Sequence, residues 1–125
     1  MKILIVDDSL MDRKLMARIL RKAELQQEII EAEDGEKALE ILAQHHHEIC
    51  VVLLDWQMPN VSGLEVLSAV YKIPDLAKMP IIMVTASGSD ENKNQAKSAN
   101  PNLAGYLVKP FKAEDLLAII KPFLR

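Results

Sequence analysis

Short apolar runs alternate along the chain with longer segments of helical periodicity, and this alternation constrains the fold more than any other feature of the sequence. Four runs are continuously apolar, which is typical of parallel strands covered on both faces. They are Ile3–Val6, Val51–Leu54, Ile81–Val84 and Tyr106–Val108. A fifth segment, Glu28–Ala32, alternates more and is expected at an edge of the sheet. Strands that alternate with helices predict βαβ units around a parallel sheet, and therefore an α/β fold.

The first helical segment follows the first apolar run and carries one apolar stripe. The stripe is formed by Leu15, Met16, Ile19, Leu20 and Ala23. Ser9, with Asp12 three residues later, resembles a capping box at the start of this helix. The periodicity therefore predicts an amphipathic helix that packs against the sheet.

Further helices are expected between and after the other strands. A second begins at Asp34 or Gly35, and a third begins near Ser62 and ends before Pro74. The segment 89–100 offers only Ala96 and Ala99 to a core and predicts a short, loosely held helix. The last helix presents one apolar face, made by Leu116, Leu117, Ile120, Phe123 and Leu124.

Length and composition fit one domain spanning residues 1–125. The formal net charge of -3 disfavours nucleic acid as a direct partner. Cys50 is the only cysteine, so a disulfide within the chain is excluded and a reducing compartment is favoured. No segment resembles a signal peptide or a membrane span, and we expect a cytoplasmic protein without membrane insertion.

Polar residues follow the predicted strands where each strand ends: Asp7 and Asp8, then Asp55, Thr85 and Lys109. Because doubly wound sheets place their sites at the carboxyl ends of the strands, we expect these side chains to meet. Three converging carboxylates repel one another unless a cation shares them, and hard oxygen ligands favour Mg²⁺. An acidic pocket of this kind suggests phosphate chemistry.

Lys109 and Thr85 add groups that bind phosphoryl oxygens, as a positive charge and as a hydroxyl donor. A carboxylate can itself attack phosphorus and form an aspartyl phosphate, and Asp55 is the residue best placed to do so. Phosphoryl transfer depends mainly on positioning and on charge neutralisation. The residue set therefore favours phosphoryl transfer to Asp55.

Four motifs, each after its own strand, closely resemble the receiver domains of two-component response regulators. They are Val6-Asp7-Asp8-Ser9, Asp55-Trp56-Gln57-Met58-Pro59 with Gly63 and Glu65, Val84-Thr85-Ala86, and Tyr106-Leu107-Val108-Lys109-Pro110-Phe111. The resemblance covers essentially the whole chain and is to stand-alone, chemotaxis-regulator-like receivers, although a receiver from a longer chain would show the same motifs. It implies a single flavodoxin-like (βα)5 domain, a doubly wound parallel sheet with strand order 2-1-3-4-5.

The resemblance also implies a mechanism. Asp55 would accept a phosphoryl group from a sensor histidine kinase, a phosphotransfer protein or a small phosphodonor. Asp8, Asp55 and the backbone carbonyl of Gln57 would ligate Mg²⁺, or Mn²⁺ in its place, and Asp7 would act through water. Lys109 and Thr85 would contact the phosphoryl oxygens. Such a protein is not an enzyme, apart from accepting the phosphoryl group and removing it again by self-catalysis.

In this family Thr85 and Tyr106 would form the switch. Their movement would alter the face made by segment 89–100, strand 106–108 and the last helix, which would bind a downstream protein. The Lys109–Pro110 bond is expected to be cis, and Gln57 and Ser87 occupy positions that tune dephosphorylation. The resemblance is compatible either with a monomer or with a dimer that forms on phosphorylation. Residues 98–105 depart from the family pattern, which affects the start of the last strand and the shape of this face.

Three alternatives compete with this hypothesis. A flavodoxin-like cofactor binder needs a glycine-rich phosphate loop, which the chain lacks. A phosphatase acting through an aspartyl phosphate needs an acid two residues after its nucleophile, where this chain has Gln57. The third is a receiver-like interaction module that works without phosphorylation.

Other features have simpler explanations. Single aspartates at strand ends are usually caps, and Tyr106 alone could belong to the core. His45-His46-His47 lacks the i, i+4 spacing of chelating histidines and fits a solvated helix end. Cys50 fits small-residue packing. Trp56, beside the predicted pocket, is expected to be a partly exposed reporter.

Overall fold

The computed structural model describes all 125 residues and contains one five-stranded sheet. Its strands are β1 (Lys2–Val6), β2 (Glu28–Ala32), β3 (Ile49–Leu54), β4 (Ile81–Thr85) and β5 (Gly105–Val108). All neighbouring strands pair in parallel, and the order β2-β1-β3-β4-β5 confirms the predicted one.

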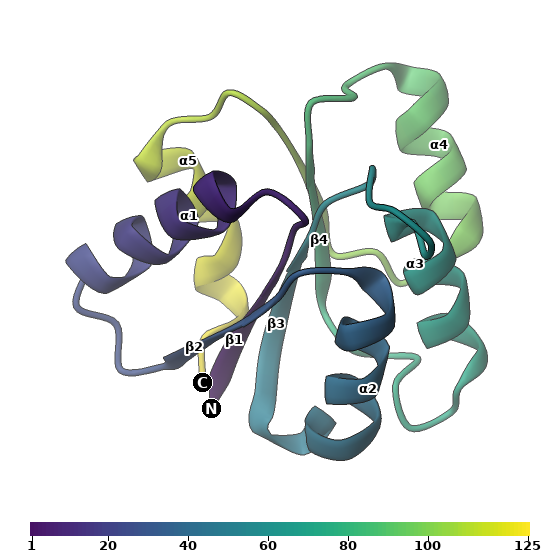
Figure 1. The fold of residues 1–125 in the computed structure, drawn as a ribbon, viewed down its shortest axis with the longest axis horizontal. Coiled ribbons are helices and arrows are strands. Elements are labelled where there is room, and N and C mark those ends of the chain that lie inside the picture. Colours follow the sequence, from purple (N-terminus) through teal and green to yellow (C-terminus); the bar gives the residue numbers. More distant parts are fainter.

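Five helices cover the two faces of the sheet. They are α1 (Leu10–Lys22), α2 (Gly35–His45), α3 (Gly63–Lys72), α4 (Asp90–Ala99) and α5 (Ala113–Ile120). Helices α1 and α5 lie on one face, and α2, α3 and α4 lie on the other (Figure 1). None of the helices is long and apolar enough to cross a membrane.

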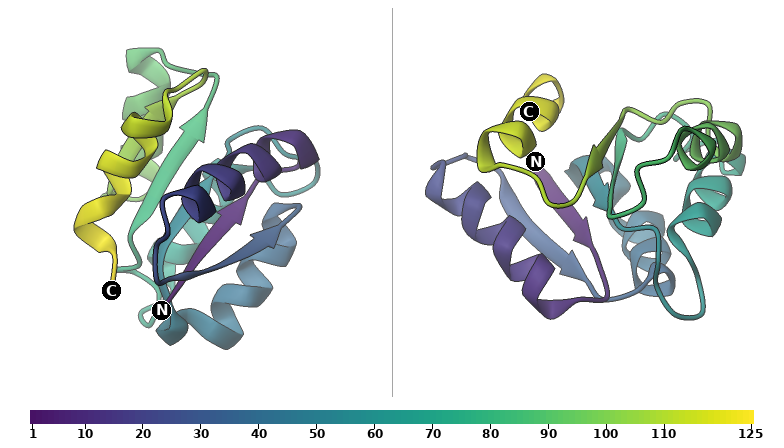
Figure 2. Two further views of the ribbon diagram at one scale, coloured as in Figure 1. Left: turned by 90° about the vertical axis from the view of Figure 1, so that its left-hand side faces the viewer. Right: turned by 90° about the horizontal axis from the view of Figure 1, so that it is seen from above.

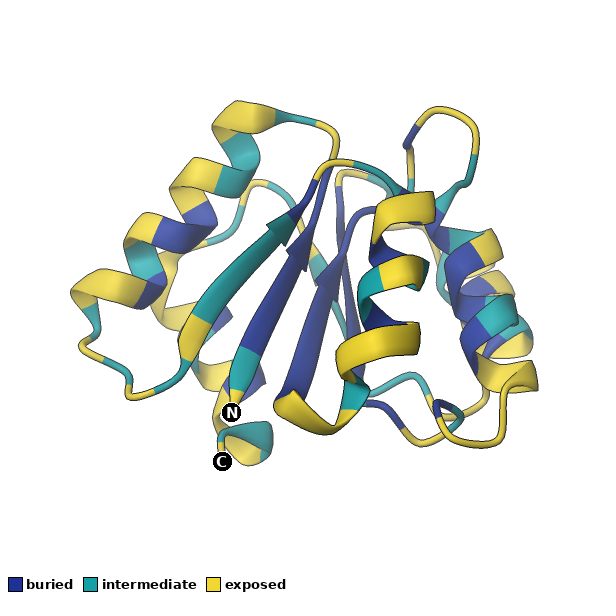
Figure 3. Cartoon of the chain, turned by 60° about the horizontal axis from the view of Figure 1, so that its bottom comes forward, coloured by how far each residue is buried: buried dark blue, intermediate teal, exposed yellow.

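The central strands are apolar at every position because both of their faces are covered. Ile3 and Ile5 of β1 pack with α1 and α5, whereas Leu4 and Val6 pack with the helices of the other face. Figure 3 shows β1, β3 and β4 buried and the edge strand β2 only partly so. In β2 only Ala32 is fully buried, which agrees with the predicted edge position.

Side-chain caps fix where the helices begin. Asp34 Oδ1 accepts the Lys37 N–H at 2.7 Å, so α2 starts at Gly35. Ser62 and Glu65 form a complete capping box at α3. Ser9 Oγ accepts the Asp12 N–H at 3.2 Å, but the return bond expected from Asp12 is absent, because the Asp12 carboxylate contacts another group described below.

Two details of the predicted helices are wrong. Leu15 is 50% exposed, and the buried positions of α1 are Met16, Ala17 and Leu20. The stripe is turned because Ala17 faces the sheet, which places Leu15 at its margin. The last helix ends at Ile120 rather than continuing to Leu124, because Pro122 cannot donate the next helical hydrogen bond.

Residues 98–105 are organised around Asn100, which is completely buried. Its Nδ2 donates to the Leu67 carbonyl of α3 at 3.2 Å, and its Oδ1 accepts the Asn102 N–H at 2.9 Å. Helix α4 has ten residues and buries only Ala96. The predicted scarcity of apolar contacts is therefore confirmed, and a buried amide helps to connect the end of α4 to α3.

The two ends of the chain lie side by side at the amino ends of the strands, as both views of Figure 2 show. Gln27 Nε2, just before β2, donates to the Arg125 carbonyl at 3.0 Å. The carboxyl ends of the strands lie at the opposite end of the sheet (Figure 1).

Candidate functional site

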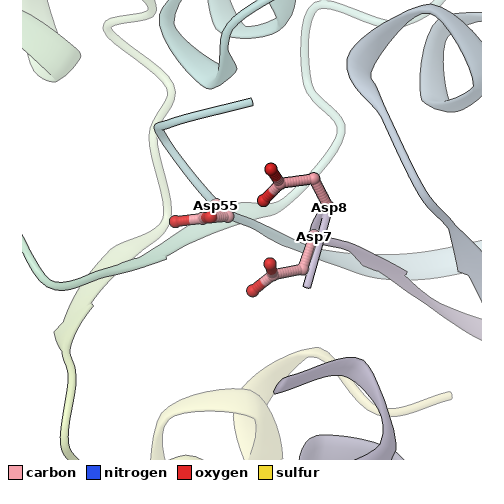
Figure 4. Close-up of side chains that lie close together, drawn as sticks. All are labelled: Asp7, Asp8 and Asp55. Atoms are coloured by element: carbon pink, nitrogen blue, oxygen red, sulfur yellow. The ribbon is translucent and has the colours of Figure 1, made fainter. Parts of the chain in front are cut away.

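Three aspartates converge at the carboxyl ends of two neighbouring strands (Figure 4). Asp7 and Asp8 follow β1, and Asp55 follows β3, where its N–H donates to the Val6 carbonyl at 2.9 Å. One oxygen from each carboxylate lies within 4.8 Å of the others. They line an open cavity of about 960 Å³ that also includes Thr85 and Lys109.

Asp7 and Asp8 differ sharply in their surroundings. Asp7 is completely buried; its Oδ1 accepts a hydrogen bond from the Ser9 N–H at 2.9 Å and its Oδ2 accepts one from Lys109 Nζ at 2.7 Å. Asp8 is exposed, and its carboxylate accepts no hydrogen bond from the chain. Both Asp7 oxygens are thus occupied by protein donors, whereas Asp8 is open to the cavity.

Asp55 is buried, with 9% of its surface exposed. Its Oδ1 accepts the Trp56 N–H at 2.9 Å and lies 3.9 Å from Lys109 Nζ. Burial, together with the negative charge of Asp7, raises the pKa of Asp55 to about 6, although the Lys109 charge opposes this shift. The carboxylate is therefore costly to ionise without further positive charge.

Lys109 reaches the cavity from the end of β5. Its N–H donates to the Thr85 carbonyl at 2.9 Å, and the Lys109–Pro110 bond is cis, the isomer that the resemblance implies. Nζ donates to Asp7 at 2.7 Å and to Asp12 Oδ2 at 2.9 Å. Burial alone would lower the pKa of this ammonium, but these hydrogen bonds and the Asp55 charge raise it.

The loop after β4 connects the cavity to β5. Thr85 is buried, and its Oγ1 accepts the Ser87 N–H at 3.4 Å. The Tyr106 hydroxyl donates to the Ser87 carbonyl, and burial raises the pKa of that hydroxyl. Tyr106 is therefore bonded to the loop that directly follows Thr85, so a movement of this loop would also displace the Tyr106 hydroxyl.

The donor set fits a hard divalent cation. All three convergent side chains offer carboxylate oxygens, and no sulfur or imidazole ligand is among them. Gln57 and Ser87 also line the cavity. By contrast, His45, His46 and His47 form no such cluster; His45 Nδ1 instead pairs with Glu48 Oε2 at 2.9 Å.

Sequence reasoning missed one charged residue of the cavity. Asp12 was expected only as a helix cap, yet its carboxylate bonds Lys109. The available signal was helical spacing: Asp12 lies in the first turn of α1, directly after the loop of Asp7 and Asp8, so it faces the same edge of the sheet.

A parallel β2-β1-β3-β4-β5 sheet with an acidic cavity at its switch point defines the class of doubly wound α/β proteins that bind ligands at strand ends. The response regulator receiver domain matches residues 3–121, and the chain belongs to this family.

Individual relatives agree with this assignment. The chain is 38% identical to chemotaxis protein CheY of Pseudomonas aeruginosa over 93% of this chain and 90% of that protein. It is 34% identical to the phosphate regulon transcriptional regulatory protein PhoB of the same organism, over 98% of this chain but only 51% of PhoB, about half its length.

Solved structures show the same fold. Chemotaxis protein CheY4 of Vibrio cholerae superposes with a TM-score of 0.86 at 33% identity and covers 98% of both chains. The Mn²⁺-bound form of response regulator Rcp1 gives a TM-score of 0.78 at 27% identity, over 96% of this chain and 88% of Rcp1. The chain is thus a receiver domain similar to CheY proteins, and two-component signalling through an aspartyl phosphate is typical of its family.

Proposed function

We propose that residues 1–125 act as one receiver domain that accepts a phosphoryl group on Asp55 from a histidine kinase or a phosphotransfer protein. The observation that carries this proposal is the Asp55 carboxylate itself, which is buried beside two other aspartates with Lys109 Nζ 3.9 Å away. The transfer is self-catalysed, so the protein is a signalling component and not an enzyme that turns over a substrate.

In the proposed step an Asp55 oxygen attacks the phosphorus of a phosphohistidine. The O–P bond forms as the P–N bond breaks, and the imidazole nitrogen keeps the electron pair of that bond. Lys109 donates to one phosphoryl oxygen and the Thr85 hydroxyl donates to another. Hydrolysis by water later reverses the modification, and Gln57 and Ser87, which line the cavity, tune its rate.

We assign Asp8, Asp55 and the Gln57 backbone carbonyl as the residues that would hold Mg²⁺, or Mn²⁺ in its place. When bound, the cation supplies positive charge against the phosphoryl oxygens. Asp7 acts through water, because both of its oxygens already accept protein hydrogen bonds. The Mn²⁺ named for Rcp1 supports a divalent cation in a related fold.

We further propose that the signal leaves through the face formed by α4, β5 and α5. Tyr106 of β5 is bonded to the Ser87 carbonyl, Lys93 of α4 lies 5.8 Å from the centre of its ring, and Val108 is exposed. A shift of Thr85 toward the phosphoryl group therefore moves the bond that holds Tyr106. Helix α4, with only Ala96 buried, offers little resistance.

Intact-protein mass after incubation with acetyl phosphate tests the phosphoacceptor. Wild type should gain one hydroxylamine-labile phosphoryl group in Mg²⁺ and none in EDTA, and Asp55→Ala should gain none. Asp75→Ala, which removes an exposed aspartate after α3, should behave as wild type. No adduct in wild type, with no response of Trp56 fluorescence to Mg²⁺, would instead support the interaction module that works without phosphorylation.

Hydrogen exchange tests the output face. Beryllofluoride with Mg²⁺ mimics the phosphoryl group, and we expect it to change exchange rates in residues 86–106 while leaving α2 unaltered. Unchanged exchange in α4 and β5 would contradict the proposed face. Size-exclusion chromatography of the same samples distinguishes a monomer from a phosphorylation-dependent dimer.

A further inference from the structure

Asp12 is a fourth carboxylate at the edge of the cavity, and the proposed function assigns it no role. Its Oδ2 lies 2.9 Å from Lys109 Nζ, and its side chain is 42% exposed, whereas that of Asp7 is fully buried. Because its backbone N–H is held by Ser9 Oγ in the first turn of α1, its place beside Lys109 is fixed by the helix cap.

The hydrogen bonds of Lys109 are largely committed before any phosphoryl group arrives. An ammonium group has three hydrogens, and Asp7 and Asp12 accept two of them. The 3.9 Å separation from Asp55 Oδ1 is too long for a hydrogen bond. Asp12 therefore occupies one of the Lys109 hydrogens that could otherwise donate to a phosphoryl group on Asp55.

Asp12 also changes the charge of the cavity. With it, four carboxylates face one ammonium group, and without it there are three. The additional negative charge attracts a divalent cation and repels an anionic phosphoryl group, so its effects on the two ligands have opposite signs.

We propose that Asp12 is a positioning residue that competes with the phosphoryl group for Lys109, strengthening cation binding and weakening the hold on the phosphoryl group. This proposal rests on the proposed function. It predicts that a partner or modification which draws Asp12 away from Lys109 prolongs the phosphorylated state.

Asp12→Asn tests the proposal, because it removes the charge while keeping the size of the side chain. For a partly exposed ion pair we expect Mg²⁺ to bind about threefold more weakly and beryllofluoride, at saturating Mg²⁺, about threefold more tightly. Trp56 fluorescence and titration calorimetry measure both affinities. Asp12→Glu, which restores the charge, should restore both values toward wild type.

Glu36→Gln is the matched control. Glu36 is an exposed acid in the first turn of α2, so this variant repeats the loss of one charge near a helix N-terminus without touching Lys109. It should leave both affinities unchanged. If Asp12→Asn behaves like Glu36→Gln, or shifts both affinities in the same direction, the competition is refuted. If wild type itself binds neither ligand, the proposed function fails and this inference fails with it.

Discussion

The two ends of the sheet place carboxylates beside cations in very different surroundings. At the carboxyl ends of the strands, Asp55 is buried next to Asp7 and Lys109, and its pKa is raised to about 6. At the amino ends, Glu48 is exposed, and hydrogen bonds from His45 and Lys2 lower its pKa. A neighbouring cation is present in both places, so burial and like charge decide the direction of the shift.

This contrast shows that the clustered carboxylates of the receiver cavity lower the free energy of unfolding of the protein. The exposed cluster of Lys2, His45 and Glu48 is nearly neutral for stability, as solvated ion pairs usually are. The buried cluster holds carboxylates together that would separate if the chain unfolded. A ligand that neutralises this charge would relieve the free-energy penalty, so the proposed cation binding and phosphorylation would both favour the folded state that binds them.

Removing Lys109 should have the largest effect. Lys109→Ala leaves the fully buried Asp7 without its charged partner, and we expect a loss of about 3 kcal/mol in the free energy of unfolding at pH 7. Urea denaturation measures this. Lys2→Ala, which removes the lysine of the exposed ion pair with Glu48, is the control and should lower the free energy of unfolding much less. Equal losses of free energy of unfolding in the two variants would contradict the stated difference between the buried and the exposed ion pairs.

Neutralising Asp55 should stabilise the protein. The pKa of Asp55 is about 6 in the folded protein, against an ordinary value of 3.8. The contribution of the Asp55 carboxyl to the free energy of unfolding is therefore fully present below pH 3.8 and is lost as the pH rises through 6. Asp55→Asn cannot ionise and does not lose this contribution. It should therefore be more stable than wild type by about 2 kcal/mol at pH 7.5, after allowance for solvent screening. The difference should vanish near pH 4. Urea denaturation across this pH range measures the difference. Equal free energies of unfolding for the two proteins at pH 7.5 would contradict a free-energy cost of ionising Asp55.

Mg²⁺ should offset part of the same penalty. At ten times its dissociation constant, a cation that binds only the folded state stabilises it by about 1.4 kcal/mol. We expect this gain in wild type and less than half of it in Asp8→Asn, as measured by denaturation with and without Mg²⁺. Glu48→Gln should keep the full gain, and an undiminished gain in Asp8→Asn would contradict the proposed role of Asp8 as a metal ligand.

The smallest effect is expected at the exposed end. The lowered pKa of Glu48 contributes stability above its ordinary value of 4.5, which is lost as pH falls. Glu48→Gln should therefore lower the melting temperature only slightly, and less in physiological than in low salt. Calorimetry at two salt concentrations measures this. A salt-independent change, as large as that of Asp55→Asn, would contradict the distinction between exposed and buried carboxylates.

The strands and their order could be predicted because burial on two faces requires apolar residues at every position, as in Val51–Leu54. The edge strand was recognisable from Glu28 and Glu31. Leu15 was misassigned because one stripe of a helix can turn by a residue when a small side chain such as Ala17 packs against the sheet. The buried amide of Asn100 gave no signal, because hydrophobicity says nothing about a polar group that finds partners in the core.

The residues that line the cavity could be predicted from the sequence, but the hydrogen bonds between them could not. Asp7, Asp8, Asp55, Thr85 and Lys109 each lie at or directly after the carboxyl end of a strand, so parallel pairing alone brings them to one cavity. That Lys109 bonds Asp7 and Asp12 rather than Asp55 depends on side-chain directions and on the cap of α1. Such choices arise from packing in three dimensions, which a linear pattern does not encode.

The adjacent chain ends have a practical meaning for anyone who tethers the protein. Because both ends lie at the amino ends of the strands, at the opposite end of the sheet from the cavity, a sensor chip, bead or fluorescent fusion attached at either end leaves the cavity facing the solution. A pair of dyes on the two ends would sit close together while the protein is folded and separate as the chain opens. Unfolding could then be followed by energy transfer without altering any residue of the cavity.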